Sequence, residues 1–462
     1  MNPELKSIEI IGLYGVRDFL IRFENNRVIL VGENGSGKTT ISRITYAVLS
    51  CNWDLLRTYP FERIVVNFGD SSIVIPSKTI NDVFGIPDIE RVEYLTDRHF
   101  FNKKSSDGLI ATVLEVRGLY ETKDTPETQY LKARYKSIYP YEYFSKIVED
   151  PNISAIYDIT KSIQERFQSK ILYLPTYRRI EEQLKNIFPD VDKDVWAKGR
   201  RRLNSERVVE LVEFGMDDVE RLVRKEQDTL KSFSQTQQNK LTLGYLSEIV
   251  SKKYDRSSSY TKIRELSDSQ IHEVLKRIDS AILSDAMKQQ VVEILNSVRT
   301  EHKHSYSAQV KIVCHYFMQL MSFDQDITSA EQNIRDFQEK CNQYLISNKI
   351  IYNSQDFTCQ LLNRVEDDFS AENSIRFQNL SSGEKQIVSL FSHLYLDKDA
   401  SVFVFIDEPE LSLSVDWQRT FLPDIVNSPN CCGLVATTHS PFIFNNELES
   451  VVHGINEFCT RG

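Results

Sequence analysis

The segment Gly32–Thr40 constrains the fold of this chain more than any other, because it reads Gly-Glu-Asn-Gly-Ser-Gly-Lys-Thr-Thr. It matches the phosphate-binding loop pattern G-x-x-x-x-G-K-[ST]. An almost continuous apolar run, Arg27–Val31, precedes it, and apolar residues at helical spacing follow from Lys38. Since such a loop works between a buried strand and the start of a helix, the sequence predicts an α/β fold at this end.

The chemistry of this loop requires its glycines and its lysine. Glycine lets the backbone turn its N–H groups toward phosphate oxygens, and the helix N-terminus adds partial positive charge. A glycine turn with an exposed lysine is the alternative, which the strand–helix context and the scarcity of glycine (16 residues) disfavour. We expect the lysine to reach the β- and γ-phosphates of ATP, and the first threonine to ligate Mg²⁺. The predicted nucleotide-binding residues are Gly32, Asn34, Gly35, Ser36, Gly37, Lys38, Thr39 and Thr40.

A second apolar run, Val402–Ile406, ends in the carboxylates Asp407 and Glu408. Alone, this could be a strand followed by an acidic turn. Together with a phosphate-binding loop, it predicts a Walker B strand. Asp407 is expected to hold Mg²⁺, directly or through water, and Glu408 to polarise the attacking water as a catalytic residue.

Two further motifs flank that strand. Leu380–Gln386 reads LSSGEKQ, in which Ser381 and Ser382 suit a helix N-cap and Gly383 allows close backbone approach. Downstream, His439 follows the apolar run Gly433–Ala436. A capped helix and a structural histidine are the plain alternatives. The order of all four motifs nevertheless resembles that of ABC-type P-loop ATPases, in which the first is the signature and the second the switch histidine.

The resemblance implies a composite site. In this family the signature of one protomer covers the nucleotide bound to the phosphate-binding loop of another. Ser381, Ser382 and Gly383 would therefore face Lys38 of a neighbour, with Glu408 and His439 as catalytic residues. Glu410–Ser414 occupies the position of the D-loop between protomers. The implied assembly is a homo-oligomer, at least a dimer and up to a hexamer, with ATP and Mg²⁺ as cofactors.

The chain divides into three predicted regions. Residues 1–180 form an N-terminal ATPase lobe and 351–462 a C-terminal lobe carrying the signature, Walker B and switch histidine. Residues 181–350 form a mainly α-helical insertion, because apolar positions there recur at helical spacing and glycine and proline are few. No heptad is sustained over four repeats, so we expect a compact insertion instead of a long coiled coil. The predicted fold class is an α/β ABC-type domain formed from both chain ends.

The composition limits the kinds of partner that the chain is expected to bind. The net charge of −10 argues against wholesale nucleic-acid binding, although a local basic patch would allow DNA contact. No uninterrupted apolar stretch reaches the length of a membrane span, and the first residues lack a secretion signal. The seven cysteines are irregularly spaced without a Cys-x-x-Cys pair. We expect a cytoplasmic protein with no membrane partner.

The architecture resembles one subgroup of the family most. Transport ATPases lack so long an insertion, chromosome-structural-maintenance proteins carry a long coiled coil, and overcoming-lysogenisation-defect nucleases append a Toprim domain. The motif positions and the segment Ile171–Glu182 are most similar to the ATPase of the PARIS anti-phage system, which implies a separately encoded Toprim nuclease and a phage trigger protein. The alternatives are a Septu- or retron-type ATPase with an HNH nuclease, or a RecF-like or SMC-like DNA-repair ATPase.

Two basic segments leave their role open. Arg178 and Arg179 follow a strand-like run and could touch phosphate or a partner, or lie in a solvated turn. The cluster Lys198–Arg202 is read as a solvated loop, with nucleic acid or an acidic trigger protein as the alternative ligand.

Overall fold

The computed structural model describes residues 4–33, 35–69, 71–84, 151–174, 208–210, 216–255, 262–276, 283–301, 306–364, 373–398 and 400–461. The chain divides into two units, which are considered separately. One comprises Met1–Phe214 with Asp397–Gly462, and the other comprises Gly215–Leu396.

A six-stranded sheet forms the centre of the first unit, in the order β13-β3-β12-β11-β6-β7. Every neighbouring pair is parallel. The strand β3 from the N-terminal end lies between β12 and β13 from the C-terminal end, which confirms an α/β domain assembled from both ends. The strands are β3 (Arg27–Val31), β6 (Lys170–Leu174), β7 (Val208–Glu210), β11 (Val402–Asp407), β12 (Cys431–Thr438) and β13 (Val452–Gly454).

Burial explains why these segments read as continuous apolar runs. All six residues of β11 are buried, as expected for a strand inside a parallel sheet covered on both faces. The helix α1 (Lys38–Leu49) packs against β11 and β12, and so fixes the end of the phosphate-binding loop to the sheet. Its Tyr46 ring stacks on Tyr173 of β6 at a centroid distance of 4.5 Å.

A second, antiparallel sheet completes the first unit, in the order β14-β2-β1-β4-β5. Its strands alternate buried and exposed positions, as a one-sided sheet does. The helix α8 (Pro151–Arg166) packs against its edge strand and against α3 (Ser77–Phe84). The strands are β1 (Leu5–Leu13), β2 (Arg17–Arg22), β4 (Arg63–Phe68), β5 (Ser71–Pro76) and β14 (Cys459–Arg461).

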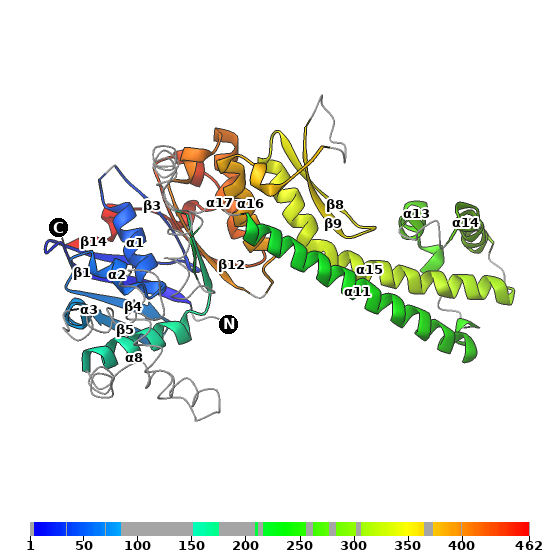
Figure 1. The fold of residues 1–462 in the computed structure, drawn as a ribbon, viewed down its shortest axis with the longest axis horizontal. Helices are drawn as coiled ribbons and strands as arrows, with labels where there is room; N and C mark the ends of the chain where they lie inside the picture. Colours follow the sequence, from blue (N-terminus) through cyan, green and yellow to red (C-terminus); the bar gives the residue numbers. More distant parts are fainter. Residues whose placement is uncertain are drawn as a thin grey trace, which may run out of the picture. The chain divides into compact units, whose positions relative to one another are not determined.

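Two long helices dominate the second unit, where a compact insertion was predicted. The helices α11 (Asp217–Val250) and α15 (Ala308–Tyr344) lie side by side as an antiparallel pair (Figure 1). With 34 residues in α11, the pair extends for about 50 Å at the helical rise per residue. The helices α13 (Asp268–Lys276) and α14 (Asp285–Thr300) pack on α15 through a small apolar cluster that includes Phe317.

The second unit also contains the signature helix. The prediction had placed this helix in the C-terminal lobe, residues 351–462, together with the Walker B strand. The helix α16 (Ser382–Tyr395) packs on both long helices. The Phe391 ring lies 5.5 Å from that of Tyr344 in α15, and His393 Nε2 lies 3.2 Å from Asp218 Oδ2 in α11. These contacts unite the signature with the helical insertion instead of with the Walker B strand. A small sheet of β8 (Asn348–Asn353), β9 (Thr358–Asn363) and β10 (Ser374–Ile375) lies between α15 and α16 in sequence.

Among the residues that the structure describes, no helix is both long enough and apolar enough to cross a membrane.

Candidate nucleotide site

The phosphate-binding loop joins β3 to α1 as predicted. Gly35 (φ 79°) and Gly37 (φ 103°) adopt backbone conformations that L side chains rarely adopt. A Cβ at either position would meet nothing within 4 Å, so the backbone conformation, and not space, requires glycine. No side chain of the described residues caps the start of α1, which leaves its first N–H groups for a phosphate. Asn34 lies outside the described residues.

Lys38 is 4% exposed and its ammonium group points back into the loop. Nζ donates to the carbonyl oxygens of Gly32 (2.9 Å) and Glu33 (3.1 Å) and lies 2.8 Å from His439 Nε2. Because an ammonium group can only donate, a charged Lys38 makes this bond to the histidine tautomer whose Nε2 is unprotonated. Burial lowers the pKa of Lys38, against the raising effect of the nearby carboxylates.

The first threonine of α1 meets the Walker B aspartate. Thr39 Oγ1 donates to Asp407 Oδ1 at 3.2 Å, and the Thr437 hydroxyl of β12 donates to the same oxygen. Asp407 is the last residue of β11 and is 3% exposed. A buried carboxylate beside a hydroxyl is the hard oxygen donor set that Mg²⁺ prefers, so Thr39 and Asp407 fit the predicted metal role. Bound there, Mg²⁺ would neutralise charge on the transferring phosphoryl group.

Glu408 follows β11 in a left-handed conformation (φ 52°, ψ 59°), which is uncommon for a residue with a side chain. Its backbone N–H donates to Thr437 O at 2.9 Å, so the strained turn is fixed against the neighbouring strand. Burial, then the hydrogen bond and negative charge of Glu410, and then Asp407 raise the pKa of Glu408 to about 8. Without nucleotide or Mg²⁺ this carboxyl therefore keeps its proton at neutral pH. A cation held by the neighbouring Asp407 would lower this pKa and leave the carboxylate able to accept a proton from water.

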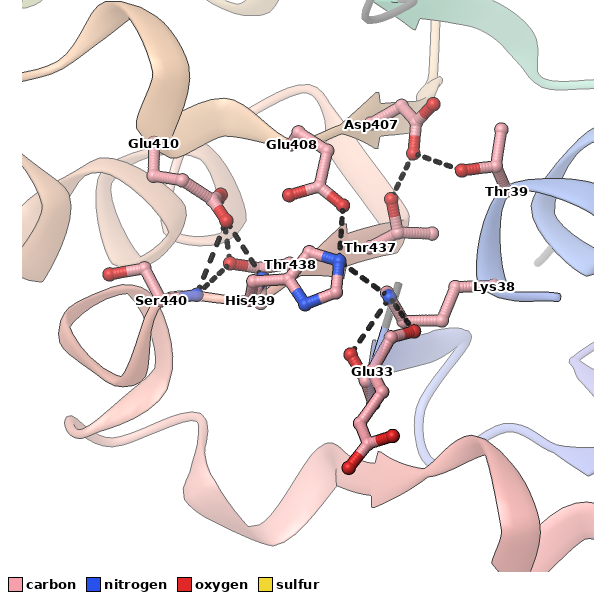
Figure 2. A network of polar contacts seen from close by, with 11 residues as sticks. Glu33, Lys38, Thr39, Asp407, Glu408, Glu410, Thr437, Thr438, His439 and Ser440 are labelled. Carbon is pink, nitrogen blue, oxygen red and sulfur yellow. Dashed lines mark hydrogen bonds and ion pairs between the residues drawn. The ribbon is translucent and has the colours of Figure 1, made fainter. Parts of the chain in front are cut away.

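His439 follows β12 and lies between these groups. Figure 2 shows the Lys38 ammonium and the Glu408 carboxylate approaching the same ring nitrogen, and Glu408 Oε1 lies 3.2 Å from it. The His439 side chain is 33% exposed and that of Glu408 15%, so solvent reaches the histidine more readily. The predicted switch histidine therefore lies in contact with both the phosphate-binding lysine and the predicted general base.

The signature residues lie in the second unit. Ser381 is the N-cap of α16, and its N–H and hydroxyl both donate to Glu384 Oε2, at 3.0 and 2.7 Å. Asn348 of β8 donates to the other oxygen of Glu384 at 2.9 Å. This capping box confirms the predicted helix start and leaves Ser381 and Ser382 exposed in the first turn, with open space at Gly383. Their role at a neighbouring nucleotide stays a prediction.

The structure thus brings together residues from the two chain ends and four polar neighbours, of which the sequence pointed only to Glu410, as part of the D-loop position. Glu410, Gln418, Thr437 and Ser440 all make polar contacts inside the site. The signals in the sequence were the second glutamate of the D-E-P-E run and the polar residues at the end of β12. Arg178, Arg179 and the cluster Lys198–Arg202 lie outside the described residues.

This arrangement defines a P-loop ATPase of the ABC type. The chain matches a family model described as the AAA ATPase domain over residues 4–444, and it belongs to that family.

Among solved structures, the chain is similar to the Smc head domain with an extended coiled coil bound to the C-terminal domain of ScpA, from Pyrococcus furiosus. The identity is 12%, with 96% of this chain and 92% of that chain covered and a TM-score of 0.34. An Smc head domain with a coiled coil and joint from Pyrococcus yayanosii gives 15% identity, 96% and 93% coverage and a TM-score of 0.28. No curated protein matches the chain.

Proposed function

We propose that this ATPase is the sensor and scaffold subunit of a bacterial anti-phage defence complex, which oligomerises through its ATP sites and controls a separately encoded Toprim nuclease. Hydrolysis itself follows from the site. A water molecule attacks the γ-phosphorus, Glu408 accepts its proton, and the bond to the β-phosphate oxygen breaks to release ADP and phosphate. Lys38 exchanges its contact with His439 for the phosphates, because its three N–H donors are already engaged.

The observation that supports oligomerisation is the distribution of the predicted site residues between the two units. Lys38, Asp407, Glu408 and His439 belong to one unit, whereas Ser381, at an exposed helix start, belongs to the other. A signature exposed in this way is suited to reach the nucleotide of a second copy. Exposed apolar side chains near the site support the same interface: Leu411 is 63% exposed, and Val415 and Phe442 are exposed as well.

Co-purification with the nuclease tests the defence role. The chain is expressed with the nuclease encoded beside it, and we expect an ATP-dependent complex that Lys38→Ala abolishes. A matched control, Lys6→Ala, alters an exposed lysine on β1 and should leave the complex intact. A complex containing an HNH nuclease instead would favour the Septu- or retron-type assignment. Absence of any nuclease in the ATP-bound complex would contradict the proposal.

A second candidate function is DNA repair of the RecF or SMC kind. The antiparallel pair of α11 and α15, inserted between the phosphate-binding loop and the signature, favours it. This candidate predicts tight ATP-dependent DNA binding by the chain alone, with a steep loss of affinity as salt rises. The net charge of −10 favours the first candidate, and a filter-binding assay at two salt concentrations separates them.

A further inference from the structure

Glu410 binds the backbone of the segment that carries His439. Its Oε1 accepts hydrogen bonds from the N–H groups of His439 (2.7 Å) and Ser440 (3.2 Å). Its Oε2 accepts from the Thr438 hydroxyl at 2.8 Å. One carboxylate therefore binds three consecutive residues at the end of β12 (Figure 2).

A second set of contacts, through Gln418, also joins the His439 segment to the loop that carries Glu410. The Ser440 hydroxyl donates to Gln418 Oε1 at 2.7 Å, and Gln418 Nε2 donates to Leu413 O at 3.1 Å. Gln418 lies on α17 (Val415–Val426) and is buried, and its amide bridges the two loops. The His439 segment is thus joined to the turn η4 (Pro409–Ser412) through Glu410, and to the residue after that turn, Leu413, through Gln418.

The hydrogen bonds that Glu410 accepts are stronger than bonds between neutral groups. A carboxylate that accepts from backbone N–H groups forms charge-assisted bonds, about twice as strong as neutral ones. Burial acts to raise the pKa of Glu410, but the hydrogen bond from Glu408 and those from the His439 backbone and Thr438 outweigh it, and the pKa is lowered. The acceptor is therefore ionised in the neutral range where the site works.

We propose that Glu410 is the positioning residue for His439, holding its backbone so that the imidazole lies between Lys38 and Glu408. Glu410 makes no hydrogen bond to the phosphate-binding loop among the described residues, and it binds the His439 segment through three bonds. It also raises the pKa of Glu408, so its effect on His439 has to be separated from that effect. This inference rests on the ATPase activity of the site, and it does not depend on the nuclease partner or on the number of copies in the assembly.

Geometry sets the size of the expected effect. His439 Nε2 lies 2.8 Å from Lys38 and 3.2 Å from Glu408, and a segment freed from Glu410 loses two of its backbone bonds. A displacement of about 1 Å at a catalytic group costs on the order of 100-fold in rate. The P-loop itself is untouched, so nucleotide affinity should change little.

The test compares Glu410→Ala, Glu410→Gln and the control Glu449→Ala, which removes an exposed glutamate on η5 (Glu449–Val451). Glu410→Ala should lower kcat by ~10- to 100-fold while the dissociation constant for ATP stays within about threefold. Glu410→Gln keeps the oxygen that accepts both backbone N–H groups, so kcat should recover to within about fivefold of wild type. The control should match wild type.

A double-mutant cycle separates positioning from general destabilisation. In a His439→Ala background, Glu410→Ala should cost several-fold less in kcat than it does in wild type, because the group it positions is gone and only its effect on Glu408 remains. Equal losses in both backgrounds would overturn the proposal, as would a loss of ATP affinity parallel to the loss of kcat.

Hydrogen exchange gives a readout that does not require turnover. The peptide that contains His439 and Ser440 should exchange faster in Glu410→Ala and at the wild-type rate in Glu410→Gln. Unchanged exchange in Glu410→Ala would overturn the proposal. Failure of the defence role, by contrast, would show only in the absence of a nuclease partner and would leave these rates as predicted.

Discussion

Glu408 combines a strained backbone with a carboxylate whose pKa is raised to about 8. Residues held in sparsely populated backbone regions occur where surrounding structure over-determines them, often at active sites. Here the bond from Glu408 N to Thr437 O holds the backbone, while burial and then the carboxylates of Glu410 and Asp407 raise the pKa. The residue is therefore placed by β11 and β12 together, and its chemistry by its neighbours.

Replacing this carboxylate tests its role directly. Glu408→Gln keeps the size of the side chain but cannot accept a proton, so turnover should fall by at least ~100-fold. Binding of ATP should persist, because Lys38 and the loop are unchanged. Steady-state hydrolysis checks the loss of turnover, and an equilibrium binding assay checks that ATP still binds. Unchanged hydrolysis would show that Glu408 is not the general base.

The raised pKa also predicts how stability depends on pH when no nucleotide or Mg²⁺ is added. The unfolded carboxyl titrates near its model value of 4.5, while the folded one keeps its proton to about 8. Between these values the unfolded state binds fewer protons, so the contribution of Glu408 to stability falls as pH rises. Glu408→Gln should therefore gain in melting temperature relative to wild type from about pH 5 to about pH 9. A difference that shrinks with rising pH would contradict the shift.

At the scale of elements, the apolar runs of the first unit could be predicted because burial on both faces leaves a direct trace in sequence. Arg27–Val31 is a strand with the predicted bounds, and α1 begins at Lys38. The turn of the phosphate-binding loop could also be predicted, since glycine is the residue that adopts positive φ most easily. What could not be read was the hydrogen bonding of Glu410 to the His439 segment, because it joins loops that are distant in sequence.

The long helix pair was missed for a physical reason. A buried polar residue, Glu331, interrupts the apolar stripe of α15 and is paired with Arg335 at 2.6 Å. An interrupted stripe reads as several shorter amphipathic segments, although the helix continues. The boundary at 351 failed for a related reason, since the contact between Phe391 and Tyr344 forms only in the folded unit.

Close packing within the parallel sheet gives an element-scale prediction. A Cβ on Gly433 of β12 would lie 2.2 Å from the Phe403 ring of β11 and 2.8 Å from Asn26 O. Gly433→Ala should therefore destabilise the protein by about 1–3 kcal/mol or more, because the ring and backbone must move. Gly244→Ala is the matched control: its Cβ meets nothing within 4 Å inside α11, and helix propensity favours alanine by about 1 kcal/mol. Denaturant unfolding of both variants, compared with wild type, checks the pair, and equal stabilities would contradict the packing argument.

At the scale of the whole molecule, the composite nucleotide site that we propose is divided twice. Its catalytic half comes from strands contributed by both chain ends, as the interleaving of β3 with β12 and β13 shows. Its signature half lies in another unit, at the start of a helix packed on the inserted helices. We propose that a second copy of the chain brings these halves together around ATP.

Mixing two inactive variants tests that claim most directly. Lys38→Ala removes the phosphate-binding lysine, and Ser381→Arg blocks the signature without weakening ATP binding to its own chain. Each alone should be inactive, but a mixed dimer contains one site with an intact lysine and an intact signature. We expect an equal mixture to recover about a quarter of wild-type hydrolysis, since half of the dimers are mixed and each mixed dimer has one working site of two. A mixture no more active than its separate components, or a Ser381→Arg protein active by itself, would contradict it.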